Sequence, residues 1–272
     1  MIFFGAQPPG PNSGCHLYGL PFESPGDCRG GASAGTRSVR EASSLLETYV
    51  PRYGRDFLDL KVADHGDLDC SSFDQMRASL EQIEPRPIFL GGDHTIAEAT
   101  VEAVARAHPD LVVLTFDAHL DAFDVYEGDR HAHATWVRRV GEQLGRGRVW
   151  VIGIRAYTRE EEDYVRHHQR MLPLHEVDLE TATRAAVAEI GDRPVYISID
   201  VDVLDPAYAP GVGNPEGLGA TNRELWKAIE LCAGLNVVAF DVLEVIPRLD
   251  TSLRTSVIAA ELLRDCSLLW YS

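Results

Sequence analysis

Aspartate and histidine residues cluster at alternate positions in two short segments of the chain. Asp200 and Asp202 follow an apolar run. A strand turns successive side chains to opposite faces, so both carboxylates would point the same way. Two like charges held together cannot both stay ionised unless a positive charge lies between them. Because Asp117, His119 and Asp121 repeat this pattern after another apolar run, the spacing predicts a site for divalent cations.

A third apolar run ends in His94, within the segment Gly91-Gly92-Asp93-His94. The three strand ends together would supply two imidazoles and four carboxylates, which are His94, Asp117, His119, Asp121, Asp200 and Asp202. This set is larger than one ion needs. Carboxylates favour Mn²⁺ or Mg²⁺, and imidazoles shift the preference toward a transition metal. We therefore expect a hydrolytic site with two Mn²⁺ per chain; the alternative is that these residues only form turns or helix caps.

The segments 91–94, 117–121 and 198–206 resemble the three metal-binding motifs of the ureohydrolases, the arginase and agmatinase superfamily of binuclear manganese enzymes. Residues 30–44 are similar to the family's N-terminal glycine- and arginine-containing segment, and residues 240–247 to its late glutamate motif. The resemblance therefore covers nearly the whole chain. It implies an arginase-like α/β fold and hydrolysis of a guanidino compound to urea and an amine.

The resemblance also implies a role for each ligand. Asp117 and Asp200 would bridge the ions, while His94 and Asp121 would complete one ligand set, and His119 and Asp202 the other. A bound ion lowers the pKa of water toward neutrality, and the resulting hydroxide would attack the guanidinium carbon. Asp121 would also hold this hydroxide by a hydrogen bond.

Two residues outside the metal motifs are expected to act on the substrate. Glu244 stands in a motif similar to the family's Glu-Val-x-Pro, whose carboxylate pairs with the planar guanidinium; the alternative is an ordinary exposed glutamate. His133 begins a His-Ala-Thr segment where many family members have His-Gly-Thr, with a histidine that transfers protons. His131 is a rival two residues away, but His133 is favoured. A histidine titrating near neutrality can protonate the leaving amine.

The sequence leaves several substrates and functions open. Arginases of the superfamily recognise the α-carboxylate of their substrate with polar side chains, notably an Asn just after Asp-Ala-His-x-Asp. Here Ala122 and Phe123 follow Asp121, which favours agmatine, cleaved to putrescine and urea. Guanidinobutyrate, arginine and other ω-guanidino compounds are alternative substrates. An alternative function is that of a catalytically silent family member acting as a binding subunit, but a silent member would be expected to have lost metal ligands. A binuclear phosphoesterase would show a Gly-Asn-His-Asp block, which is missing.

The ligands require elements that bring them together. Apolar runs alternate with helical patterns over residues 1–272 without a linker or repeat, which predicts one domain, a three-layer α/β/α sandwich with a mainly parallel sheet. Strands are expected at 17–20, 58–62, 88–90, 111–116, 149–154, 195–199 and 237–242. Helices are expected at 36–49, 72–82, 95–107, 135–144, 159–168, 181–190, 221–233 and 252–263. Ligands bind beyond the carboxyl ends of such strands, so loops 121–133 and 205–218 would wall the crevice.

Three helices carry recognisable start signals. Thr95, Thr221 and either Thr251 or Ser252 are expected N-caps. Glu98 and Glu224 each lie three residues after the first two, which is capping-box spacing.

Bulk properties narrow the partners and the compartment. The net charge of −17 argues against nucleic acid and would weakly attract a small cationic guanidino substrate. No apolar run reaches the length of a membrane span, and the N-terminus does not resemble a signal peptide. Scattered cysteines predict reduced thiols and a cytoplasmic location; they are Cys15, Cys28, Cys70, Cys232 and Cys266. The resemblance implies a homotrimer or homohexamer.

Overall fold

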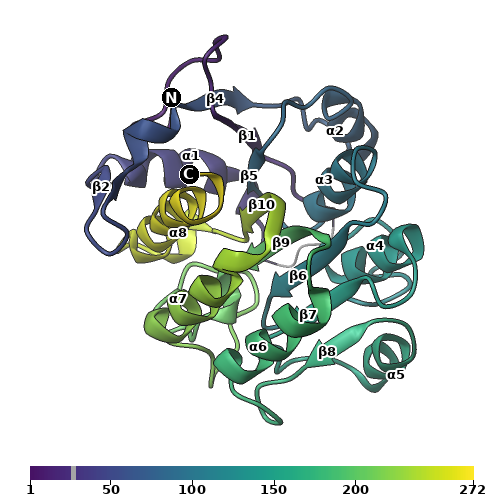
Figure 1. Ribbon diagram of the computed structural model, residues 1–272. Helices are drawn as coiled ribbons and strands as arrows, with labels where there is room; N and C mark the ends of the chain where they lie inside the picture. Colours follow the sequence, from purple (N-terminus) through teal and green to yellow (C-terminus); the bar gives the residue numbers. More distant parts are fainter. Residues whose placement is uncertain (26–28) are drawn as a thin grey trace.

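A central parallel sheet organises the molecule (Figure 1). The computed structural model describes residues 1–25 and 29–272, so Cys28 lies outside the described residues. In this part of the chain the sheet has eight strands. In spatial order they are β4 (Val62–Asp67), β1 (Cys15–Leu20), β5 (Pro87–Gly91), β10 (Asn236–Leu243), β9 (Pro194–Asp200), β6 (Val112–Phe116), β7 (Val149–Ile152) and β8 (Arg170–Leu172). Each neighbouring pair is parallel.

Helices cover both faces of the sheet, which confirms the expected three-layer sandwich (Figure 1). One face is covered by α1 (Gly35–Ser43), α6 (Leu179–Ile190), α7 (Asn222–Leu231) and α8 (Arg254–Tyr271). The other is covered by α2 (Phe73–Ser79), α3 (Ile96–Ala105), α4 (Trp136–Leu144) and α5 (Arg159–His168).

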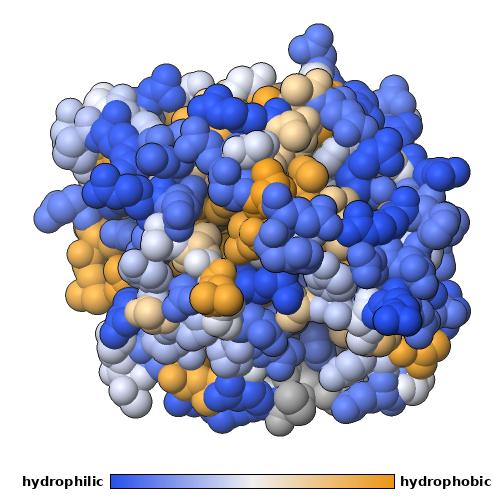
Figure 2. Space-filling model, turned by 90° about the horizontal axis from the view of Figure 1, so that it is seen from below, coloured by the Kyte–Doolittle hydropathy of each residue, from blue (hydrophilic) through white to orange (hydrophobic). Residues whose placement is uncertain are grey.

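The central strands bury both of their faces. Ile88 and Leu90 belong to the core under α1, α6, α7 and α8, whereas Phe89 belongs to the core under α2 to α5. Period-two alternation between two cores explains why these strands read as continuous apolar runs. The face seen in Figure 2 is mostly hydrophilic, with hydrophobic side chains in small groups.

Two expected elements near the N-terminus were wrong. The predicted strand 58–62 is a 3-10 helix at Phe57–Leu60, because Asp56 accepts a hydrogen bond from the Leu58 N–H and starts a turn. The predicted helix 36–49 ends at Ser43, and its last residues instead enter a short antiparallel hairpin, β2 (Tyr49–Val50) with β3 (Arg55–Asp56). This hairpin and the three-residue strand β8 were not anticipated.

Thr95 and Thr221 stand at the N-cap positions of α3 and α7 as expected, whereas the start expected at Thr251 or Ser252 was wrong. Thr221 and Glu224 form the expected capping box of α7. Thr95 makes no capping bond, and Glu98 bonds the His131 ring instead. The last helix begins after Leu253, which takes a left-handed conformation, and it runs eight residues beyond its expected end at 263.

Among residues 1–25 and 29–272, the cysteines are free thiols. Within the same ranges no helix is both long and apolar enough to cross a bilayer.

Candidate metal centre and substrate cavity

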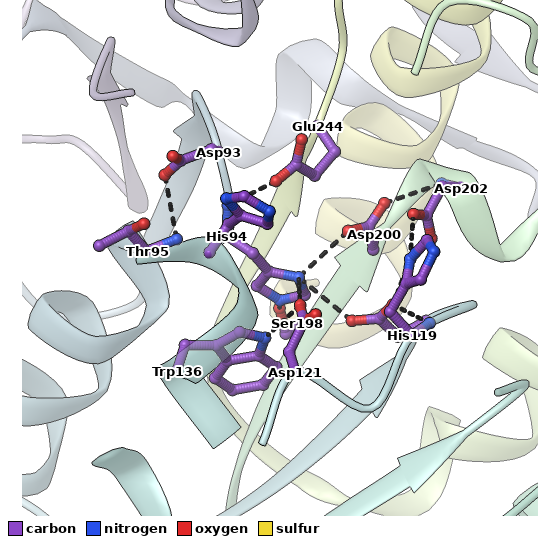
Figure 3. Close-up of polar contacts among 12 residues, drawn as sticks. Asp93, His94, Thr95, His119, Asp121, Trp136, Ser198, Asp200, Asp202 and Glu244 are labelled. Carbon is purple, nitrogen blue, oxygen red and sulfur yellow. Dashed lines mark hydrogen bonds and ion pairs between the residues drawn. The ribbon is translucent and has the colours of Figure 1, made fainter. Parts of the chain in front are cut away.

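Four neighbouring strands deliver the candidate site residues to one edge of the sheet. The strands β5, β10, β9 and β6 lie side by side, and their carboxyl ends lead into His94, Glu244, Asp200 and Asp117 respectively. Figure 3 shows the side chains of His94, Asp200 and Glu244 close together, although they come from distant parts of the sequence.

The expected ligands form two overlapping groups. Donor atoms of His94, Asp117 and Asp200 lie within 4.8 Å of one another, and so do those of Asp117, His119 and Asp202. The His94 Nδ1 atom is 3.1 Å from Asp200 Oδ2, and His119 Nδ1 is 2.8 Å from Asp202 Oδ2. Asp117 belongs to both groups. This is the arrangement that a carboxylate bridging two ions requires.

Asp121 is placed less closely than the other five. Its Oδ2 atom lies 3.8 Å from His94 Nδ1 and accepts a hydrogen bond from the Trp136 indole at 3.2 Å. Asp121 has a positive φ of 46°, a backbone conformation that is uncommon for a residue other than glycine. It lies beside the first group without joining either one.

The buried carboxylates of the cluster favour the binding of positive ions. Burial, together with the charges of Asp202 and Asp117, raises the pKa of Asp200 well above its usual range. Burial opposes the charged form of His119, yet the carboxylates of Asp202, Asp121 and Asp117 raise its pKa to about 11. The Asp117 Oδ2 atom is buried, lies 3.2 Å from His94 Nδ1, and makes no hydrogen bond among the described residues. These oxygen and nitrogen donors therefore fit divalent transition-metal ions.

A second layer of residues fixes the ring of His94. The Ser198 hydroxyl donates to Asp241 Oδ1 at 2.7 Å, so its lone pair accepts from His94 Nε2 at 2.9 Å. Nδ1 is then the nitrogen that faces the carboxylates of Asp117 and Asp200, which raise the pKa of His94 well above its usual value although burial opposes the charged form. Trp136 stacks on the same ring with centroids 4.2 Å apart. Such outer partners set the tautomer of a metal-binding histidine.

Glu244 lies above the cluster, at the start of the loop after β10 (Figure 3). Its Oε1 atom accepts the His94 backbone N–H at 2.7 Å. The carboxylate lines the cavity, and burial with the charges of Asp200 and Asp93 raises its pKa well above the usual value. A guanidinium ion bound there would supply the missing countercharge.

The two rival histidines lie in different places. His133 is buried, lines the same cavity as Glu244, and has its Nδ1 atom 3.5 Å from the Ser24 hydroxyl. His131 is half-exposed, bonds Glu98 at 2.9 Å and stacks on Phe73, outside that cavity.

A cavity of about 540 Å³ opens over the cluster. The two expected loops supply walls, with Phe123 and Tyr126 from one and residues 213–216 from the other. The sequence did not indicate the third wall, Ala156 to Thr158 with Glu161, or Arg29 at the cavity. It also missed Trp136, Ser198 and Asp241. These three residues are of types common in cores and strands, so the sequence alone did not indicate a role for them.

Comparison with known proteins identifies the family. The Arginase family pattern matches residues 13–269. An agmatinase of Bacillus cereus is 34% identical over 281 aligned residues, covering 99% of this chain and 96% of the relative. A guanidinobutyrase of Pseudomonas aeruginosa is 35% identical, covering 92% and 84%. The solved proclavaminate amidino hydrolase of Streptomyces clavuligerus matches with a TM-score of 0.91 and 30% identity, covering 100% and 97%. The chain therefore belongs to the arginase family and to its agmatinase-like branch.

Proposed function

We propose that this protein hydrolyses agmatine to putrescine and urea as a metal-dependent amidinohydrolase. The observation that carries the proposal is a pair of metal-ligand groups sharing Asp117, with the Glu244 carboxylate in the cavity beside them. The agmatinase relatives support the reaction and the substrate.

The metal centre in this proposal holds two Mn²⁺ ions. Asp117 and Asp200 would bridge them, His94 and Asp121 would complete one ligand set, and His119 and Asp202 the other. When bound, the ions would lower the pKa of water and so supply a hydroxide nucleophile at neutral pH.

The remaining site residues bind the substrate and move protons. Glu244 would pair with the guanidinium and orient its carbon toward the nucleophile, since a carboxylate matches the planar fork of donors. Asp121 would hold the nucleophile by a hydrogen bond. His133, which lines the cavity, would protonate the leaving amine; His131 lies outside the cavity and is the weaker candidate.

A second candidate substrate is a guanidino acid such as guanidinobutyrate. Arg29 lines the cavity and donates from Nη1 to the Gly213 carbonyl at 3.2 Å. A cationic side chain on this wall would favour a carboxylate at the far end of the substrate. The guanidinobutyrase relative supports this reading.

We also propose a domain organisation, a cellular location, a pathway and an oligomeric state for the chain. The chain would act as one ureohydrolase domain over residues 1–272, in the cytoplasm, in polyamine biosynthesis, and as a homotrimer or homohexamer. Light scattering at micromolar concentration checks the assembly, and the mass of a monomer would count against it.

Urea release from a panel of guanidines tests the function. With Mn²⁺ the protein should release urea from agmatine; chelation should abolish the activity, and added Mn²⁺ should restore it. Metal analysis should find two ions per chain in the active protein. Absence of urea release from every guanidine in the panel would overturn the proposal.

A further inference from the structure

Ser24 places a buried hydroxyl between His133 and Asp93, where the mechanism above gives it no role. We propose that Ser24, anchored by Asp93, is a positioning residue that fixes the orientation and the tautomer of His133. This inference rests on the proposed function, in which His133 protonates the leaving amine.

The hydrogen bonds around Ser24 determine which atom donates. Both the Ser24 hydroxyl and the Ser24 N–H lie 2.6 Å from Asp93 Oδ2, and the other Asp93 oxygen accepts the Thr95 N–H at 3.1 Å. A serine hydroxyl has a single hydrogen, which it gives to Asp93 here. Its lone pairs remain, so the hydroxyl acts as acceptor toward His133 Nδ1, 3.5 Å away. Bonds to catalytic groups are often this long before substrate binds.

The consequence for His133 is a defined tautomer. If Nδ1 carries the hydrogen that points to Ser24, then Nε2 is the nitrogen left for substrate. Nε2 can therefore take up a proton and deliver it to the leaving nitrogen while Nδ1 stays bonded to Ser24. Tyr126 packs its ring edge-on against the imidazole, with centroids 5.2 Å apart, and limits rotation from a second side.

Backbone hydrogen bonds hold the loop that carries Ser24 against the loop after β5. The Asp93 N–H donates to the Phe22 carbonyl at 3.0 Å, joining the loop after β1 to the loop after β5. A Cβ atom on Gly92 would lie 1.8 Å from that carbonyl, so only glycine permits this approach. Glu23 then accepts hydrogen bonds from the backbone of Gly31 and Ser33.

The same arrangement occurs at His94. There Asp241 accepts from Ser198, and Ser198 accepts from the histidine ring. Two hydrogen-bonded Asp–Ser–His series thus lie at the same edge of the sheet. One ends at His94, a candidate metal ligand, and the other ends at His133, the candidate general acid. The better-packed series at His94 shows that a serine held by a buried aspartate can orient a histidine in this fold.

Steady-state kinetics of Ser24→Ala and Ser24→Thr on agmatine with Mn²⁺ test the proposal. Ser24→Ala should lower kcat about tenfold, a fraction of the 10²–10⁴ that a general acid supplies, and leave KM within about twofold. Ser24→Thr keeps the hydroxyl and should retain at least about half of kcat. Metal content should match the wild type, and the melting temperature should fall by no more than a few degrees, because one buried hydrogen bond is lost. Ser267→Ala, which removes a buried hydroxyl that bonds Leu263 within α8, is the matched control and should not change kcat.

A double-mutant cycle separates positioning from a structural effect. Because Ser24 acts through His133, Ser24→Ala should cost nothing further in a His133→Asn background. An equal loss in both backgrounds, or wild-type kcat in Ser24→Ala, would overturn this inference and leave the proposed function standing. If the wild type releases no urea from any guanidine, the proposed function fails and this inference with it.

Discussion

A carboxylate shared by two ions should matter more to metal binding than one that serves a single ion. Asp117 contributes to both ligand groups, whereas Asp202 contributes to one. We therefore expect Asp117→Asn to reduce the bound Mn²⁺ far below two per chain, and Asp202→Asn to retain about one. Metal analysis after gel filtration checks this. If Asp200→Asn removes both ions while Asp117→Asn keeps one, Asp200 is the main bridge.

Substitution of Glu244 tests substrate binding separately from metal binding. Glu244→Gln keeps an oxygen that can accept the His94 N–H but removes the charge that would face the guanidinium. A charged hydrogen bond contributes about 1.5–3 kcal/mol, so kcat/KM should fall by at least about tenfold. Metal content should stay at the wild-type value. Loss of both metals in this variant would mean that Glu244 acts mainly by supporting His94.

The sequence predicts chemistry at single residues better than it predicts their surroundings. Alternating Asp and His residues after apolar runs were sufficient to find the metal-site candidates, because strand geometry fixes the direction of each side chain. The residues that hold them were not found. Trp136 and Ser198 look like core and strand residues in the sequence, and their roles arise only when distant segments meet.

At the scale of helices, one sequence pattern gave two different outcomes. Thr95 and Thr221 are each followed by a glutamate at capping-box spacing, yet only Thr221 makes the box. Asp93 already accepts the Thr95 N–H, and Glu98 is drawn away to His131. The Thr-x-x-Glu pattern therefore predicted a capping box correctly only where neither side chain had a competing partner from another part of the fold.

Stability measurements should reproduce this difference. Thr221→Ala removes a working cap and should lower the free energy of unfolding by about 1 kcal/mol, or about 2–4 °C in Tm. Thr95→Val removes a buried hydroxyl that has no hydrogen-bond partner among the described residues, so stability should stay equal or rise by up to about 1 kcal/mol. Thermal unfolding of the metal-free protein checks both. A larger loss for Thr95→Val than for Thr221→Ala would contradict this account of the caps.

At the scale of the molecule, hydropathy predicted the layers but not the order of the strands. The strand β10 is late in the sequence, yet it lies between β5 and β9. Periodicity shows that a strand is buried on both faces, but the order depends on which crossovers pack best, and no single segment encodes this. This insertion is what brings Glu244 beside His94 and Asp200.

The charge of the whole protein and the walls of the cavity together determine which guanidines should react. The net charge is −17, and among the described residues the cavity is lined by three acidic side chains outside the proposed metal-ligand set: Glu161, Glu216 and Glu244. Such a field attracts a cationic substrate, more strongly at low salt. Ala122, the residue after Asp121, is fully buried and gives its N–H to Glu161, so it offers nothing to an α-carboxylate.

Agmatine should therefore exceed arginine in kcat/KM by at least about tenfold, which corresponds to roughly 1.4 kcal/mol of differential transition-state binding. Initial rates of urea release at low and high salt check this, and the preference should narrow as salt screens the acidic walls. Guanidinobutyrate is the critical comparison, because Arg29 is the arginine that lines the cavity among the described residues. If guanidinobutyrate reacts best and Arg29→Gln abolishes that advantage, the enzyme is a guanidino acid hydrolase. Equal efficiency on arginine and agmatine would show that the missing Asn after Asp121 does not determine specificity.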